Sequence, residues 1–162
     1  MKDRGLHQGF TLIEVMVVIS IIAIILAIGI PSLVSSRKLA NETSAIGALK
    51  AVATQETLFR ENDSDGDGAP DYGTLTELST TSLVDSVLGS GTTQGYAVAV
   101  AYSTTSPETL WYAVANPILA GGTGDRYFVT NHSGVIFYTT SGVFTLNNTN
   151  CLIPGNALPV GR

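Results

Sequence analysis

The chain has 162 residues, of which 13% are charged and 44% hydrophobic, and its net charge is −5. This length suits one domain, with or without an appendage. The acidity argues against a nucleic-acid binder, because neutralising phosphates needs a basic surface, and the low charge argues against a disordered chain. The mean hydropathy of +0.29 is high for a soluble domain and indicates a membrane-like segment.

The hydrophobic residues concentrate near the N-terminus. Among residues 10–31, 17 of 22 are hydrophobic, and residues 15–36 carry no formal charge. A helix over those 22 uncharged residues is about 33 Å long, which is enough to cross the hydrocarbon core of a bilayer. The segment is therefore a candidate membrane span.

Two ordinary interpretations of this segment are a cleaved signal peptide and a plain single-span anchor. A signal peptide has a shorter apolar region that ends at a small-residue site, and Ala27-Ile28-Gly29 fits such a site only weakly. A plain anchor does not explain Glu14, which lies at the start of the apolar stretch. A carboxylate at membrane depth costs a few kcal/mol unless it finds a partner.

Residues 9–14 read Gly-Phe-Thr-Leu-Ile-Glu, which resembles the processing and assembly motif of the type IV pilin superfamily. The resemblance implies that a dedicated peptidase cuts the chain between Gly9 and Phe10 and then methylates the new amine of Phe10. It also implies that Glu14 meets the N-terminal amine of a neighbouring subunit. Such a pair neutralises a buried carboxylate and sets the axial register between subunits.

Two further features agree with this resemblance. The predicted leader, residues 1–9, carries Lys2 and Arg4, which favour the cytoplasmic side of a membrane. The apolar run ends at Pro31. Family members often carry a proline at about this point, where the first helix bends or locally melts during assembly. Proline removes one helical hydrogen bond and clashes with the preceding turn, so Pro31 is predicted to be an assembly residue.

Residues 32–60 keep a helical pattern. The apolar stripe expected to pack against the rest of the domain consists of Leu39, Ile46, Leu49, Val52, Ala53 and Phe59. Together with the apolar run, this pattern predicts one helix over residues 10–60, about 77 Å long, which ends before the Asp-Gly sequence that follows Asn62. No small domain buries that length, so the first half is expected to enter a membrane or a filament core.

From residue 96 onward, alternating side chains and turn residues predict strands. The predicted strands are residues 96–102, 109–115, 126–130, 134–140 and 142–146. Their short links favour antiparallel pairing. In the first strand Tyr96, Val98, Val100 and Tyr102 share one face, and three alanines share the other. The alanine face is expected to let the helix approach closely.

These elements predict an α+β fold, in which a long N-terminal helix packs on an antiparallel sheet, and the pilin family has this fold. Residues 71–95 show no clear pattern beyond a turn of helix near residues 83–88. The predicted organisation is a cleaved leader (residues 1–9), a transmembrane or filament-core half of the helix (residues 10–36) and a globular head (residues 37–162).

An acidic loop follows the predicted helix. Its spacing, Asp-x-Asp-x-Asp-Gly-x-x-Asp, resembles calcium loops of the EF-hand kind and thrombospondin type 3 repeats. The predicted calcium ligands are Asp63, Asp65, Asp67 and Asp71. The twelfth position, where an EF-hand has a bidentate Glu, is Thr74, and the nearest substitute, Glu77, is out of register.

Calcium binding by this loop is expected to be weak, at about millimolar concentration as in extracellular modules. The alternative is a solvated turn that ends the helix. Glu56 and Glu61 raise the number of carboxylates to six within 16 residues. Mutual repulsion among them favours a counterion.

The sequence offers little for catalysis. After Gly9 there is one histidine, His132, and one cysteine, Cys151, and no nucleophile-elbow or phosphate-loop motif is present. We therefore expect no enzymatic activity and no required cofactor. Cys151 cannot form an intramolecular disulfide and is predicted to be a buried apolar residue. Many pilins close a C-terminal loop with a disulfide between two cysteines. Cys151 has no second cysteine for such a bond, so residues 147–162 need another restraint or are mobile.

The resemblance implies a structural subunit of a type IV pilus-like filament. Its precursor is expected to lie in the inner membrane among lipids and to meet the prepilin peptidase and an assembly platform. It then polymerises, alone or with other pilins, into an extracellular filament for adhesion, motility or DNA uptake. The alternative is a pseudopilin of a type II secretion system, which forms a short periplasmic piston. A third class, a hydrolase or binding module on a plain anchor, predicts an uncut N-terminus and indifference to Glu14.

Overall fold

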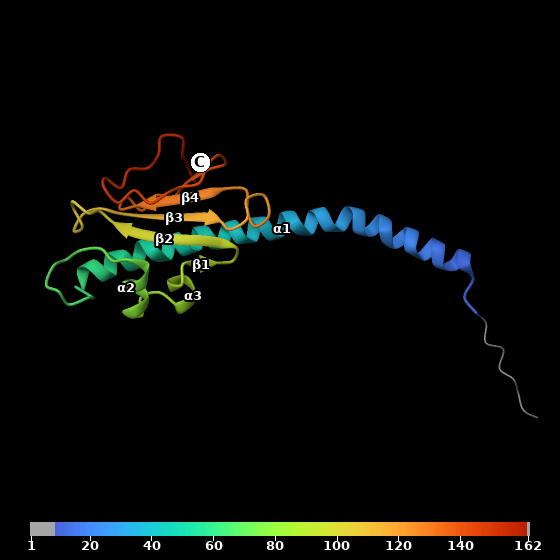
Figure 1. The fold of residues 1–162 in the computed structure, drawn as a ribbon, viewed down its shortest axis with the longest axis horizontal. Coiled ribbons are helices and arrows are strands. Elements are labelled where there is room, and N and C mark those ends of the chain that lie inside the picture. Colours follow the sequence, from blue (N-terminus) through green and yellow to red (C-terminus); the bar gives the residue numbers. More distant parts are fainter. Residues whose placement is uncertain (1–8, 162) are drawn as a thin grey trace, which may run out of the picture. The chain divides into compact units, whose positions relative to one another are not determined.

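The computed structural model describes residues 9–161 (Figure 1). The predicted leader lies outside the described residues, except for Gly9. By its internal contacts the chain divides into two compact units, residues 1–36 and residues 37–162. The boundary falls inside the long helix, so each half of that helix belongs to a different unit.

Helix α1, Leu12–Glu61, is 50 residues long and agrees within two residues with the predicted helix over residues 10–60. It is helical through Pro31 without interruption, although proline has no N–H to donate to the carbonyl one turn earlier. The bend or melting that the resemblance implies during assembly stays a prediction.

None of the α1 residues of the first unit is buried within the chain. Every residue from Leu12 to Ser36 is exposed, and Ile24 and Ile28 are 64% and 74% exposed. By length and composition this helix can cross a membrane. Aliphatic surface of this extent is unfavourable in water, so this half of α1 needs lipid or other chains around it.

The head half of α1 buries one stripe against the sheet. The buried positions, separated by alternating steps of three and four, are Glu42, Ala45, Leu49, Val52, Glu56 and Phe59. Leu49, Val52 and Phe59 confirm the predicted stripe, whereas the prediction for Leu39 is wrong, since it is 60% exposed. Two of the six positions are glutamates, which the apolar pattern did not include.

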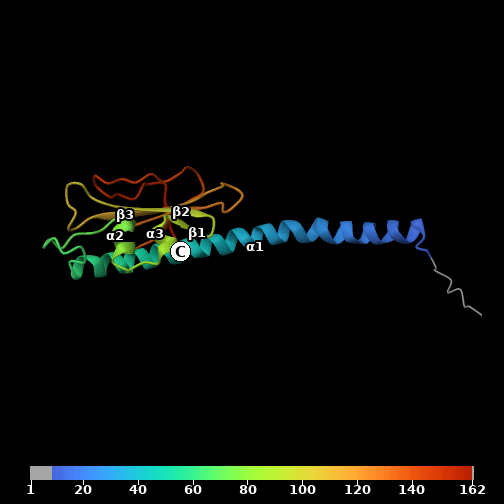
Figure 2. The ribbon, with the colours of Figure 1, turned by 60° about the horizontal axis from the view of Figure 1, so that its bottom comes forward.

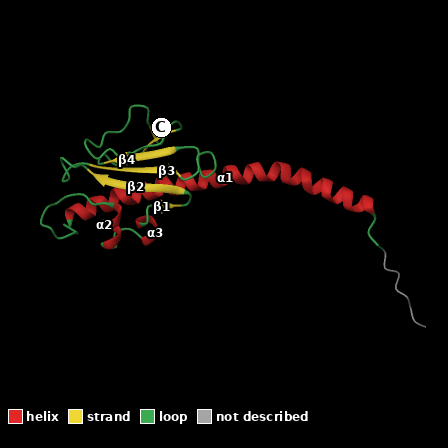
Figure 3. Ribbon diagram, in the orientation of Figure 1, coloured by secondary structure: helices red, strands yellow, loops and turns green. Residues whose placement is uncertain are grey.

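The rest of the head forms one antiparallel sheet, whose six strands lie in chain order (Figure 3). The strands are β1 (Thr92–Thr93), β2 (Tyr96–Tyr102), β3 (Trp111–Pro117), β4 (Tyr127–Asn131), β5 (Phe137–Thr139) and β6 (Leu158–Pro159). The prediction over residues 96–102 coincides with β2. The predictions over residues 109–115, 126–130 and 134–140 correspond to β3, β4 and β5 with shifted ends.

The predicted strand over residues 142–146 is wrong, because this segment forms no strand. Its backbone is held instead by Asn116 near the end of β3. The Asn116 amide donates to the carbonyl of Phe144 at 2.8 Å, and the N–H of Phe144 donates to the Asn116 side-chain oxygen at 3.1 Å. A side chain therefore replaces the neighbouring strand as the hydrogen-bond partner.

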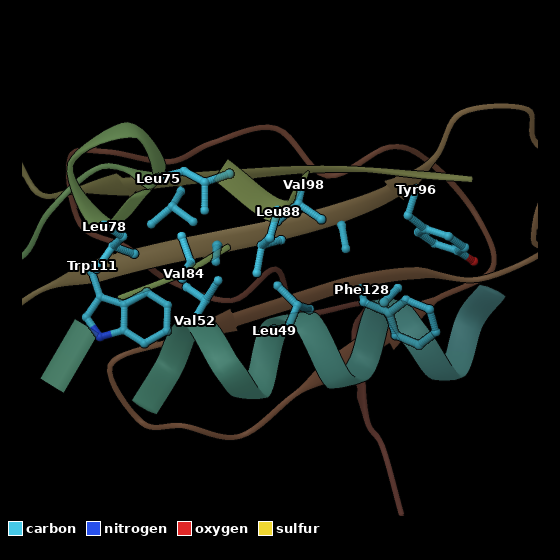
Figure 4. Packing of buried hydrophobic residues seen from close by; sticks show 14 of the residues in the cluster. Leu49, Val52, Leu75, Leu78, Val84, Leu88, Tyr96, Val98, Trp111 and Phe128 are labelled. Carbon is cyan, nitrogen blue, oxygen red and sulfur yellow. The ribbon is translucent and has the colours of Figure 1, made fainter. Parts of the chain in front are cut away.

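The sheet is buried on both faces. On one face, α1 and the short helix α2 (Leu75–Thr80) pack on β2, β3 and β4, as the side chains of Leu49, Val52, Leu78, Val98 and Phe128 show (Figure 4). The other face carries a second core of Tyr112, Val114, Val129, Phe144 and Cys151. Figure 2 shows the orange to red loops on the side of the sheet away from α1, while the chain end returns to α1, where Val160 packs against the first core.

The expectation that the alanine face of β2 receives α1 is wrong. Val98 and Val100 belong to the core shared with α1, and Ala99 packs on the opposite side. The small residues on the α1 side come from β3, where Ala113 and Ala115 are fully buried. The strand register pairs Val100 with Ala113 and Val98 with Ala115, so large and small side chains alternate across neighbouring strands.

Two short helices connect the acidic loop to β1. Thr74 and Glu77 form a capping box at the start of the first, and Asp85 caps the second. The sequence indicated only a helical turn near residues 83–88, because helices this short contain too few residues for a clear periodicity. The two helices are α2 (Leu75–Thr80) and α3 (Ser86–Gly89).

The C-terminal segment is restrained without a disulfide. Cys151 is fully buried in the second core, which confirms its predicted burial. The Asn131 amide donates to the Cys151 carbonyl at 2.9 Å, and the Ser103 hydroxyl donates to the Thr149 carbonyl at 2.8 Å. These contacts, together with the Asn116 clamp, supply the restraint that the sequence left open.

Candidate assembly motif and acidic loop

The predicted processing site lies just before α1. Gly9 and Phe10 are exposed, and Phe10 is 83% exposed. A Cβ built on Gly9 would meet no atom within 4 Å. Nothing in the packing of the described chain requires glycine there, which fits a residue that another protein recognises.

Glu14 closes a capping box at the start of α1. Its Oε2 accepts hydrogen bonds from the N–H and the hydroxyl of Thr11 at 3.2 and 3.1 Å, and its own N–H donates to the Thr11 hydroxyl at 3.2 Å. This arrangement satisfies N–H groups that have no partner within the helix. Thr11 was not predicted as a site residue from the sequence, although Thr-x-x-Glu is the spacing of a capping box.

Three of the four predicted calcium ligands lie together. One carboxylate oxygen from each of Asp63, Asp65 and Asp67 lies within 4.8 Å of the other two. Gly68 has a φ of +87° and donates its N–H to the Asp63 carboxylate at 3.1 Å. Carboxylates this close repel one another, and hard oxygen ligands suit Ca²⁺.

Asp71, the fourth predicted ligand, lies outside this group of three. Its pKa is raised first by partial burial, then by the negative charges of Asp65, Asp67 and Glu77. Asp71 is therefore close enough to feel the charges of the acidic loop. Among residues 9–161, no lysine or arginine forms an ion pair with these aspartates.

Thr74, at the twelfth position of the EF-hand pattern, has a different structural role in this chain. The N–H and hydroxyl of Thr74 donate to Glu77 Oε2 at 2.6 and 2.8 Å. The Glu77 carboxylate thus completes the cap of α2. The bidentate ligand of an EF-hand has no counterpart in this loop, which fits the weak calcium binding expected from the sequence.

Glu56 belongs to the core, although its position in the sequence grouped it with the carboxylates of the acidic loop. It is fully buried, its Oε2 accepts the N–H of Gly73 at 3.1 Å, and its Oε1 has no hydrogen-bond partner. Burial raises the pKa of Glu56 to about 8 against the lowering effect of the Gly73 N–H, and the charges of Glu77 and Asp71 add to the rise. At pH 7 this carboxyl group is therefore mostly protonated, and it ties the end of the acidic loop to α1.

The second buried glutamate, Glu42, ties the loop between β3 and β4 to α1. Its carboxylate accepts the N–H groups of Asp125 and Arg126 at 2.8 and 3.2 Å, and the Nε of Arg126 at 2.7 Å. The Arg126 guanidinium lies over the rings of Phe128 and Tyr138. These contacts give the buried carboxylate a paired cation and three hydrogen bonds.

The two residues considered for catalysis have ordinary surroundings. Cys151 is buried, and burial raises the pKa of its thiol, which makes the thiol a poor nucleophile. His132 is exposed in the turn after β4. Cys151 is thus best explained as a packing residue of the second core.

Comparisons with known proteins match part of the chain. Residues 4–30 match the prokaryotic N-terminal methylation motif. The chain is similar to the type IV wide pilus major component PilA4 of Thermus thermophilus, with 48% identity over 58 residues, 35% of this chain and 44% of that protein. It is also similar to the type IV major pilin protein PilA of Myxococcus xanthus, with 40% identity over 68 residues, 41% of this chain and 31% of that protein. No solved structure matches significantly.

The matches span less than half of either relative. They nevertheless agree with the site and the fold. The matched motif covers Gly9, Phe10 and Glu14, the residues that carried the resemblance. The fold is a long N-terminal helix on an antiparallel sheet. The motif and the two pilins thus support a relationship to the type IV pilin superfamily, and the fold agrees with it.

Proposed function

We propose that the chain is a structural subunit of a type IV pilus-like filament. The precursor is anchored in the inner membrane by the first half of α1, cut between Gly9 and Phe10, and methylated at Phe10. It then polymerises through α1 into an extracellular filament. The observation that carries this proposal is a methylation motif joined to an apolar half-helix that has no buried residue within its own chain.

Assembly in this proposal exchanges one apolar environment for another. Lipid covers residues 15–36 in the precursor, and the same side chains pack against those of neighbouring copies in the filament. Apolar burial stabilises both states, and the heads form the outer wall. The subunits pass from one state to the other without exposing the helix to water.

Glu14 sets the register between copies. In the single chain its carboxylate bonds to Thr11. Cleavage creates a cationic amine at Phe10, which in an apolar core needs an anion beside it. The Glu14 carboxylate of a neighbouring copy supplies that anion at one axial offset only.

The first test is the N-terminus of the assembled protein. We expect mass spectrometry and N-terminal sequencing to find a chain that begins at a methylated Phe10. A chain that begins at Met1, or beyond Ala27, contradicts the proposal.

The second test is Glu14→Ala, with Glu61→Ala at the exposed other end of α1 as the matched control. Glu14→Ala should leave cleavage intact and strongly reduce filament number in electron micrographs, whereas Glu61→Ala should change neither. Normal filaments in the Glu14→Ala variant would remove the role assigned to this carboxylate.

The pseudopilin alternative differs in where the polymer is found. A pilin predicts filaments outside the cell with this chain as a main component. A pseudopilin predicts retention in the periplasm and loss of exoprotein export when the chain is deleted. Both relatives carry pilin or pilus names, which favours the pilin.

We also propose that the acidic loop binds Ca²⁺ weakly through Asp63, Asp65 and Asp67, with Asp71 beside them. The close approach of three carboxylate oxygens supports this site. Calcium binding would stabilise the connection between α1 and α2 in a filament exposed to extracellular medium. A thermal melt with and without chelator tests it, as described in the Discussion.

A further inference from the structure

We propose that the loop between β3 and β4, residues 118–124, rests on the headgroup layer of the membrane while the subunit is still a precursor. This surface rests on the membrane anchoring proposed above. Its occupant is an anionic phospholipid surface. The structure of the loop, its attachment to α1 and the charges around it support the proposal.

The loop presents an uncharged surface on an ordered turn. Residues 118–122 are exposed and carry no charge, and Ile118 and Leu119 are 61% and 64% exposed. The Leu119 N–H donates to the Thr123 hydroxyl at 3.2 Å, and the Thr123 N–H donates to the Leu119 carbonyl at 2.8 Å. Two large aliphatic side chains are thus held in solvent by a turn that cannot easily fold them inward.

Hydrogen bonds attach this loop to the first turns of α1 in the head, where its orange ribbon lies beside the helix (Figure 1). The Lys38 ammonium donates to the Asp125 carboxylate at 3.0 Å, and the Asn41 amide donates to the Thr123 carbonyl at 2.9 Å. The Glu42 carboxylate holds the next two backbone N–H groups. The loop is therefore fixed to residues 38–42 of α1.

Residues 38–42 follow directly on the proposed span. Ser36 is the last residue of the uncharged stretch, and Arg37 carries the first charge after it. Asn41 lies about 8 Å from Ser36 along a helix, and even a fully extended chain would allow only about 18 Å. The interfacial layer of a bilayer is about 5–8 Å thick on each side. A helix over these five residues places the attachment point of the loop about one interfacial-layer thickness beyond the end of the proposed span.

The charges of the head suit an anionic membrane surface at this end. Three of its five described basic residues, Arg37, Lys38 and Arg126, lie here. Lys38 and Arg126 are paired with Asp125 and Glu42, so the group has a net charge of +1, and the exposed Arg37 forms no ion pair with a described residue. The acidic loop begins beyond Glu61, about 35 Å farther along the helix. Anionic lipids attract the basic end and repel the acidic end.

Exposed apolar side chains occur elsewhere on the head, so exposure alone does not identify the surface. Leu152 is 60% exposed, close to the 64% of Leu119. However, it follows Cys151, whose carbonyl is bonded to Asn131. Asn131 is the last residue of β4, whereas the loop enters at its first residue. Leu152 is therefore a matched control of the same residue type and exposure.

The test measures how deep three fluorescent labels lie in the full precursor, reconstituted in vesicles of phosphatidylethanolamine and phosphatidylglycerol. The labels are attached to Leu119→Cys, Leu152→Cys and Ile25→Cys, and the wild-type chain, with its fully buried Cys151, provides the blank. The quenchers are lipids with a nitroxide at the headgroup or in the middle of the acyl chain. We expect the headgroup nitroxide to quench the label at position 119 several-fold more than the label at position 152.

The label at position 25 separates this inference from the proposed anchoring. If the mid-chain nitroxide quenches it while positions 119 and 152 are quenched equally, the inference is wrong and the anchoring stands. If the label at position 25 is not quenched, the anchoring itself is wrong. A label at position 119 that is shielded from aqueous iodide, yet not quenched by lipid, indicates contact with another copy and also overturns the inference.

Discussion

The two halves of α1 are built for different surroundings. Residues 12–36 carry one charge and no buried side chain, whereas residues 37–61 carry seven charges and bury a six-residue stripe. A helix with a partner on one side needs one apolar stripe, and a helix surrounded by lipid or other helices needs apolar residues all round. The distribution of apolar residues around a helix thus shows how many of its sides pack against lipid or other parts of protein.

The largest difference should appear when one aliphatic residue is truncated in each half. Leu49→Ala should lower the free energy of unfolding of the head by about 2–5 kcal/mol, because it leaves a cavity in the core. Ile24→Ala should leave that value unchanged, since Ile24 is exposed and belongs to the other unit. Urea unfolding of the detergent-solubilised chain, followed by the single tryptophan, Trp111, which is 2% exposed, measures both.

Equal losses in the two variants would show that the first half of α1 supports the head. The comparison between the two halves would then fail.

One glutamate from each half of α1 sharpens the comparison, because Glu14 and Glu42 have different roles. Glu42→Ala should destabilise the head by about 3 kcal/mol, since it leaves Arg126 and two backbone N–H groups without their carboxylate. Glu14→Ala should not change the stability of the head, and its effect should be confined to assembly. The same tryptophan signal distinguishes them, and a stable Glu42→Ala head would contradict the structural role of this ion pair.

Glu56 should give the head a pH dependence that the first half of α1 lacks. The pKa of about 8 in the folded state exceeds the ordinary value of 4.5, so protonated Glu56 favours folding. This stabilisation is complete below pH 4.5 and is lost progressively as the pH rises through 8. Glu56→Gln should remove this part of the pH dependence in urea titrations at several pH values. An unchanged pH profile would refute the assignment.

The smallest effect should come from calcium at the end of α1. At ten times the dissociation constant, calcium should stabilise the head by about 1.4 kcal/mol, seen as a higher melting temperature than in chelator. Asp65→Asn should abolish the shift, and Glu108→Gln, an exposed acid outside the loop, should keep it. No shift in the unmodified chain would leave the loop as a solvated turn.

Local sequence patterns predicted the elements whose secondary structure does not depend on which segment they pack against. β2 alternates over seven residues, and α1 is apolar or amphipathic up to the Asp-Gly turn, so both could be located from the chain alone. The segment around Phe144 has the same kind of residues as a strand. Its partner is the side chain of Asn116, and no local pattern contains that information.

The buried glutamates were missed for a different reason. Glu42 and Glu56 continue the three- and four-residue steps of the stripe, but a search for apolar residues skips them. Their partners, the Arg126 loop and the Gly73 N–H, come from distant parts of the chain. In the N-terminal motif, the residue types and spacing pointed to Gly9, Phe10 and Glu14. The cap formed by Thr11 was missed, although its Thr-x-x-Glu spacing is present in the sequence.

The amide clamps on the C-terminal segment have a consequence for where this protein can fold. Because Asn116 and Asn131 hold that segment through hydrogen bonds, and the sequence has one cysteine, the head needs no thiol oxidase or disulfide isomerase to order it. The head should keep its full stability in dithiothreitol. The proposed filament would therefore not depend on an oxidising medium for the order of this segment.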